Sequence, residues 1–106
     1  MAVEARIHFG HGGRAMIRIS GVLGGHDVPA LRATFTNVLA ARPGEILVDL
    51  HGCGFADSAG PTLLSWLLRR GREEGLAVFL SGLAEDEEAF LRRAGLTEQH
   101  ASGVPA

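Results

Sequence analysis

The chain has 106 residues, of which 46% are hydrophobic and 21% charged, and its formal net charge is -2. A chain of this length fits one domain, and without a dominant basic segment it shows no nucleic-acid footprint. Its one cysteine excludes an internal disulfide, no stretch approaches the ~20 apolar residues of a membrane span, and no apolar leader follows the first methionine, so we expect a cytoplasmic protein without membrane insertion.

The first elements predicted are two strands, a loop and a helix. Residues 5–9 and 14–20 contain β-branched residues and flank a glycine pair, which is typical of a hairpin. Residues 21–26 are expected to form a loop. A helix is predicted to begin after Asp27, its expected N-cap, and to end before Pro43. The residues expected to face the core are Val28, Leu31, Phe35, Val38 and Leu39.

The rest of the chain predicts strands and helices in alternation. Residues 46–50 are almost wholly apolar, as expected for a buried strand covered on both faces. A tight turn and a helix over residues 58–74 should follow, with Gly75 ending the helix, and residues 76–80 should form another buried strand. Acidic residues would open a third helix over 85–93, which two arginines would close. Strands alternating with helices predict an α/β fold with a mixed sheet.

The start of the helix predicted at 58–74 carries a candidate function. The start of a helix has unpaired backbone N–H groups and the positive end of the helix dipole. A hydroxyl can therefore cap the helix there, and the negative charge of a phosphate would be tolerated. At about 100° per residue, Trp66 falls beside a polar face and three leucines point to the core. The polar face contains Ser58, Thr62, Ser65, Arg69 and Arg72, and the leucines are Leu63, Leu64 and Leu67. The simplest interpretation is that Ser58 or Asp57 caps the helix.

The segment before and around Ser58 contains a longer motif. Val48-Asp49-Leu50-His51-Gly52, followed by Phe55-Ala56-Asp57-Ser58-Ala59-Gly60, resembles the V-D-L-S-G-x-x-F-x-D-S-[SA]-G-L-G signature of the STAS domain family. That family includes anti-sigma-factor antagonists and cytoplasmic domains of sulphate transporters. Further likeness at residues 19–23, 29–32, 80–82 and 91–96 extends the resemblance over residues 5–100. The resemblance implies one α/β domain over residues 1–106, with a mixed sheet of four to five strands and helices packed on one face.

The resemblance also implies a function. In antagonists of this family, an ATP-dependent serine kinase that doubles as the anti-sigma factor phosphorylates the serine after the aspartate, and the phosphorylated antagonist no longer binds it. By position, Ser58 would be the phosphoacceptor of a non-catalytic binding module that needs no cofactor or metal. The surface for this protein partner would combine the loop at 22–27 with the polar helix face. Its residues would be Gly24, His26, Asp27, Asp57, Ser58, Thr62, Ser65 and Trp66.

The chain departs from the family pattern in its early loop and at the G-L-G end of the motif, which reads Gly60-Pro61-Thr62 here. Val22 and Gly24 stand where the family usually has an acidic pair, and Pro61 replaces a leucine that we expect on the exposed side of the helix. Two alternatives stay open: a STAS subunit docked on an ABC transporter ATPase or a stress-sensing scaffold, and a small hydrolase that uses Ser58 with a histidine. The histidines available for such a hydrolase include His8, His26 and His51.

Overall fold

The computed structural model describes residues 3–83, which form four strands, two helices and two short 3-10 turns. In chain order these are β1 (Glu4–Phe9), η1 (His11–Gly13), β2 (Arg14–Leu23), η2 (Gly25–Asp27), α1 (Val28–Ala40), β3 (Glu45–Phe55), α2 (Ala59–Glu73) and β4 (Ala77–Ser81). The predicted hairpin, the first two helices and the strand at 76–80 are confirmed. The third helix predicted at 85–93 lies outside the described residues.

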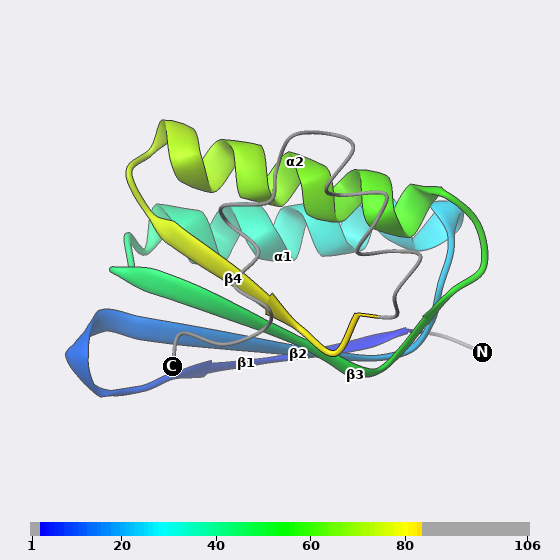
Figure 1. Cartoon of the computed structure of the whole chain (residues 1–106), viewed down its shortest axis with the longest axis horizontal. Helices are drawn as coiled ribbons and strands as arrows, with labels where there is room; N and C mark the ends of the chain where they lie inside the picture. The colour runs from blue at the N-terminus through cyan, green and yellow to red at the C-terminus, as the bar shows by residue number, and fades with distance from the viewer. Residues whose placement is uncertain (1–2, 84–106) are drawn as a thin grey trace.

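The strands form one mixed sheet in the order β1-β2-β3-β4. β1 runs antiparallel to β2, while β2, β3 and β4 are parallel neighbours. A helix joins each parallel pair, and such crossovers are right-handed in nearly all proteins. Because both crossovers step in the same direction across the sheet, α1 and α2 lie on the same face (Figure 1). The predicted fold class, a mixed sheet with helices on one face, is confirmed.

The core lies between the two helices and the sheet face that they cover. Alternate residues of a strand point to the same face, and the register aligns Ile17 of β2 with Val48 of β3 and Leu80 of β4. All three are fully buried, as are Phe35 of α1 and Leu64 of α2. Burying a side chain of this size contributes roughly 1.5–3 kcal/mol, so this interior is the main source of stability.

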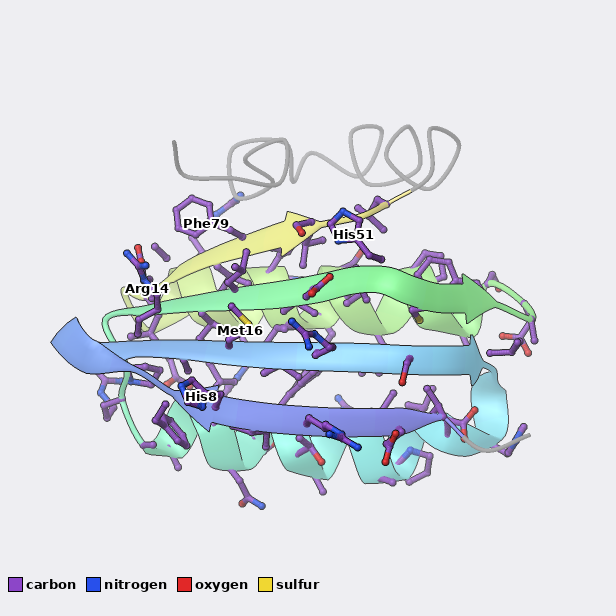
Figure 2. The ribbon with its side chains drawn as sticks, turned by 90° about the horizontal axis from the view of Figure 1, so that it is seen from below. His8, Arg14, Met16, His51 and Phe79 are labelled. Carbon is purple, nitrogen blue, oxygen red and sulfur yellow. The ribbon has the colours of Figure 1, made fainter. Side chains whose placement is uncertain are left out.

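The second sheet face, opposite the helices, carries the strand residues that alternate with the buried ones. His8, Met16, Leu47 and Phe79 stand side by side across the strands, and Figure 2 looks onto this row. No described helix lies on this face, and Leu47 and Phe79 are half-buried. The strand that we expected to be covered on both faces is therefore covered by described helices on one face only.

β2 and β3 are both longer than the sequence predicts. Residues 21–23, expected in a loop, belong to β2, and residues 51–55, expected in a turn, belong to β3. The two segments pair with each other from Ser20 opposite Gly52 to Leu23 opposite Phe55, after a register shift between Arg18 and Ser20. The glycines that suggested a loop carry the same backbone N–H and C=O groups as other residues, so they can still pair between strands. The tertiary contact thus overrides their low strand propensity.

Candidate partner-binding site

The segments that precede α1 and α2 lie together at one end of the molecule. β2 and β3 are parallel, so their carboxyl ends reach the same edge of the sheet, and each leads into the N-terminus of a helix (Figure 1). The Ala56 N–H donates to the Leu23 carbonyl at 2.8 Å, and the Gly25 N–H donates to the Asp57 carboxylate at 3.3 Å. These bonds join the loop at 22–27 to the segment that carries Ser58.

Asp57 satisfies one of the free backbone N–H groups at the N-terminus of α2. Its Oδ1 accepts a hydrogen bond from the Ala59 N–H at 2.9 Å, while its Oδ2 accepts from Gly25. Ser58 is exposed, and its hydroxyl makes no capping hydrogen bond. Of the two residues that the sequence offered as caps, the structure therefore selects Asp57. The Ser58 hydroxyl lies at the helix start, makes no capping hydrogen bond there and is accessible to another protein.

Asp27 does not cap α1 in the way that the sequence predicts. Its carboxylate accepts a hydrogen bond from the Gly24 N–H at 2.9 Å and makes no capping bond to α1. The backbone of Asp27 is already helical, so its side chain turns back and stabilises the preceding 3-10 turn instead. The carboxylate is only 11% exposed, whereas the neighbouring His26 side chain is 82% exposed. Gly24 is buried, so in this loop the exposed polar side chain is His26.

α2 presents a narrower polar face than the helical projection predicts. Leu63, Leu64 and Leu67 are buried as expected, but so is Ser65, which is 6% exposed and whose Oγ has no hydrogen-bond partner in the described structure. The prediction that Ser65 forms part of the exposed partner surface is therefore wrong. The buried arc also includes Pro61, which we expected on the exposed side. These residues are buried because α2 contacts α1 as well as β3 and β4. The covered part of the helix surface is therefore wider than the stripe of leucines.

A groove of about 320 Å³ opens between α1 and α2 beside this site. Val28 of α1 and Leu63 of α2 form its apolar floor together with the half-buried Trp66. The rim carries Arg32, Thr62 and Arg69, all exposed.

The Arg32 guanidinium lies 4.8 Å from the centre of the Trp66 ring, which is cation–π geometry. Sequence reasoning placed Trp66 correctly at the edge of the polar face but missed Arg32. The only local signal was its helical spacing from Val28, four residues earlier on α1. Nothing in the sequence pairs that face of α1 with α2.

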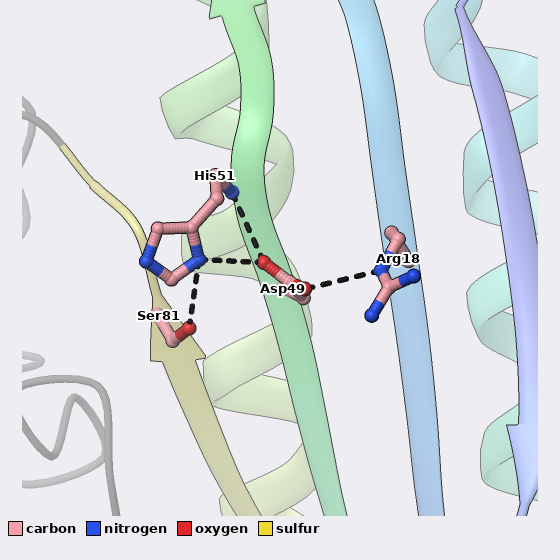
Figure 3. Close-up of polar contacts among 4 residues, drawn as sticks. All are labelled: Arg18, Asp49, His51 and Ser81. Atoms are coloured by element: carbon pink, nitrogen blue, oxygen red, sulfur yellow. Dashed lines mark hydrogen bonds and ion pairs between the residues drawn. The ribbon is translucent and has the colours of Figure 1, made fainter.

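The second sheet face carries a separate polar cluster (Figure 3). His51 Nδ1 lies 2.7 Å from Asp49 Oδ1 and 3.5 Å from the Ser81 hydroxyl, while Arg18 donates to Asp49 Oδ2 at 3.2 Å. A catalytic serine and aspartate must contact different nitrogens of the histidine, but here both contact Nδ1. The cluster therefore does not form a serine-hydrolase relay. The serine that contacts His51 is Ser81 and not Ser58.

The same contacts perturb the pKa of Asp49. The hydrogen bond to the His51 ring is the largest influence and holds the pKa of this carboxyl below its ordinary value. Partial burial acts in the opposite direction, while the His51 backbone N–H and the Arg18 guanidinium add to the lowering. The ionised Asp49 carboxylate thus contacts Arg18 of β2 and His51 of β3, and His51 extends the cluster to β4.

Comparisons with known proteins agree with this architecture. A family model described as "Mlab, STAS domain" matches residues 9–103. An anti-sigma factor antagonist from Mycobacterium paratuberculosis superposes with a TM-score of 0.71 at 24% identity, over 94% of this chain and 84% of that chain. The unphosphorylated anti-sigma factor antagonist SpoIIAA gives a TM-score of 0.71 at 19% identity, over 84% of this chain and 82% of that one.

An antisigma-factor antagonist STAS domain from Rhodobacter sphaeroides covers 96% of each chain with a TM-score of 0.65 at 16% identity. At these identities the solved structures establish the shared fold. The comparison with curated proteins returns no match. Within residues 3–83, no helix has the length and apolarity needed to cross a membrane.

Proposed function

Because this chain belongs to the STAS domain family, we propose that it is a cytoplasmic anti-sigma-factor antagonist that binds a serine-kinase anti-sigma factor and is released when that kinase phosphorylates Ser58. One observation carries this proposal. Ser58 is exposed at the start of α2, and its hydroxyl is left unused because Asp57 caps the helix. A kinase can therefore reach this oxygen without unfolding any part of the domain.

The position also tolerates the product of the reaction. A phosphate adds about -1.5 to -2 charges, and the positive end of the α2 dipole favours negative charge there. The two oxygens of Asp57 already accept the Ala59 and Gly25 N–H groups, so the cap does not depend on the Ser58 hydroxyl. The phosphorylated domain should keep its fold.

A docked partner would respond very differently from the domain itself. A protein surface that fits a neutral hydroxyl must desolvate the dianion and accept its repulsion from any nearby carboxylate. A penalty of about 3 kcal/mol would weaken binding roughly a hundredfold. Phosphorylation would thus separate the two proteins while leaving the antagonist intact, which is how a module without catalytic activity can act as a switch.

The first test is direct phosphorylation. The purified chain is incubated with the anti-sigma kinase encoded nearest to its gene, together with ATP and magnesium, and analysed by peptide mass spectrometry. We expect a single added phosphate on Ser58. The signal should disappear in Ser58→Ala and persist in Thr62→Ala, which removes the other exposed hydroxyl of this face.

Phosphate that persists in Ser58→Ala would refute the assignment of Ser58. Tight binding to a transporter ATPase without any phosphorylation would favour the docking-subunit alternative instead.

A further inference from the structure

Building on the proposed function, we infer that the partner segment that docks beside Ser58 is acidic and inserts one apolar side chain into the groove between α1 and α2. The groove provides the apolar half of this match. Its apolar lining of Val28, Leu63 and Trp66 has the Arg32 guanidinium stacked against the indole, and its volume of about 320 Å³ suits an inserted side chain. A whole helix, about 10–12 Å across, would not fit inside it.

The arginines at the rim provide the charged half. Elsewhere in the described residues, arginines pair with carboxylates: Arg14 with Glu45, Arg18 with Asp49, and Arg42 and Arg70 with Glu74, at 2.5–3.3 Å. Arg32 and Arg69 have no carboxylate partner within residues 3–83. Two positive charges therefore flank the apolar lining without a carboxylate partner in the part of the chain that the structure describes.

The two carboxylates of the adjacent loops form no ion pair with Arg32 or Arg69. Asp27 accepts the Gly24 N–H, and both oxygens of Asp57 accept backbone N–H groups. In the loop before α1, Val22 is half exposed and Gly24 is buried, and neither carries a charge. The rim of the groove thus carries two arginines that no described carboxylate pairs with, and an acidic partner segment would complement them.

Trp66 and Arg32 are suited to act as the energetic centre of such an interface. Tryptophan and arginine are the residues most often found as binding hot spots, and their mutual stacking restrains both side chains before a partner arrives. An acidic side chain of the partner could pair with Arg32 or Arg69 while an adjacent apolar side chain covers the indole. An acidic segment also explains the direction of the switch, because a phosphate on Ser58 would repel it.

The test is charge reversal against the same anti-sigma kinase, with affinity measured by calorimetry at two salt concentrations. We expect Arg32→Glu and Arg69→Glu each to weaken binding at least about tenfold, and the wild-type affinity to fall between about 0.05 and 0.5 M salt. The double variant should lose most of that salt dependence. Arg6→Glu is the matched control, because Arg6 is exposed on β1 and lines a hollow away from the groove. It should change affinity by less than about twofold.

The outcomes separate this inference from the proposed function. If the kinase phosphorylates Ser58 of the wild type but binds both groove variants as tightly as the wild type, the acidic-partner inference is overturned and the switch stands. If the kinase neither binds nor phosphorylates the wild type, both fall. Circular dichroism and thermal melting of each variant will show whether weaker binding reflects the surface, and Arg69→Lys should restore affinity because it restores the charge.

Discussion

At the residue scale, the division of labour between Asp57 and Ser58 is the feature on which the proposed switch depends. The aspartate holds the start of α2 and the Gly25 backbone, and the serine beside it remains exposed. A residue that both capped the helix and accepted phosphate would couple signalling to unfolding. Because the two roles fall on adjacent residues, a charge can be added to one without removing the hydrogen bonds of the other.

This division predicts unequal effects of two alanine substitutions on stability. Asp57→Ala removes the cap of α2 and the link to Gly25, so it should lower the free energy of unfolding by about 0.5–2 kcal/mol. Ser58→Ala should change it by less than about 0.5 kcal/mol, as for an exposed side chain without partners. Urea unfolding followed by circular dichroism measures both values. Equal losses would mean that Ser58 also stabilises the helix start.

At the scale of elements, polar contacts on the second sheet face connect strands that are distant in sequence. Asp49 of β3 contacts Arg18 of β2, and His51 of β3 contacts Ser81 of β4. On the opposite sheet face the same strands bury Ile17, Val48 and Leu80. The period of two thus gives each strand one face that packs the core and one face that carries a hydrogen-bonded cluster.

The lowered pKa of Asp49 makes the contribution of this cluster depend on pH. A carboxyl whose pKa is lower in the folded than in the unfolded state binds fewer protons when folded, so its stabilisation is present above its unfolded pKa and is lost as the pH falls. Wild type should therefore be more stable than Asp49→Asn near neutral pH, and this difference should shrink between about pH 5 and pH 3.

Urea denaturation of both proteins across this pH range measures the difference. Its persistence in acid would show that packing, and not the charge of Asp49, is responsible.

At the scale of the whole molecule, the exposed Ser58 stands apart from the core, whereas the groove shares Leu63 with it. The core lies between the sheet and the helices, whereas Ser58 lies in the segment that leads from β3 into α2, and the groove opens between α1 and α2. Ligand sites of open α/β sheets commonly lie at the carboxyl ends of the strands, where loops can vary without disturbing the strands. Stability and binding should accordingly respond independently to substitutions at Ser58.

The substitution Ser58→Asp tests that independence. Aspartate places one negative charge where phosphate would place about -1.5 to -2. We expect a melting temperature close to that of the wild type, because the residue is exposed and the helix dipole favours the charge. Affinity for the anti-sigma kinase should fall, with Ser58→Ala as the control that binds like the wild type. An aspartate variant that binds with unchanged affinity would contradict the switch.

The sequence by itself determined the order of the first six major elements, the leucine face of α2 and the position of Ser58 at a helix start, because these follow from local periodicity and capping patterns. Only the tertiary structure decided that residues 21–23 extend β2, that Ser65 is buried, that Asp27 serves the loop and that Arg32 meets Trp66. Each of these outcomes depends on how strands, helices and turns pack or bond in three dimensions. Periodicity along a chain records which face of an element is apolar, but it does not record which other element will cover that face.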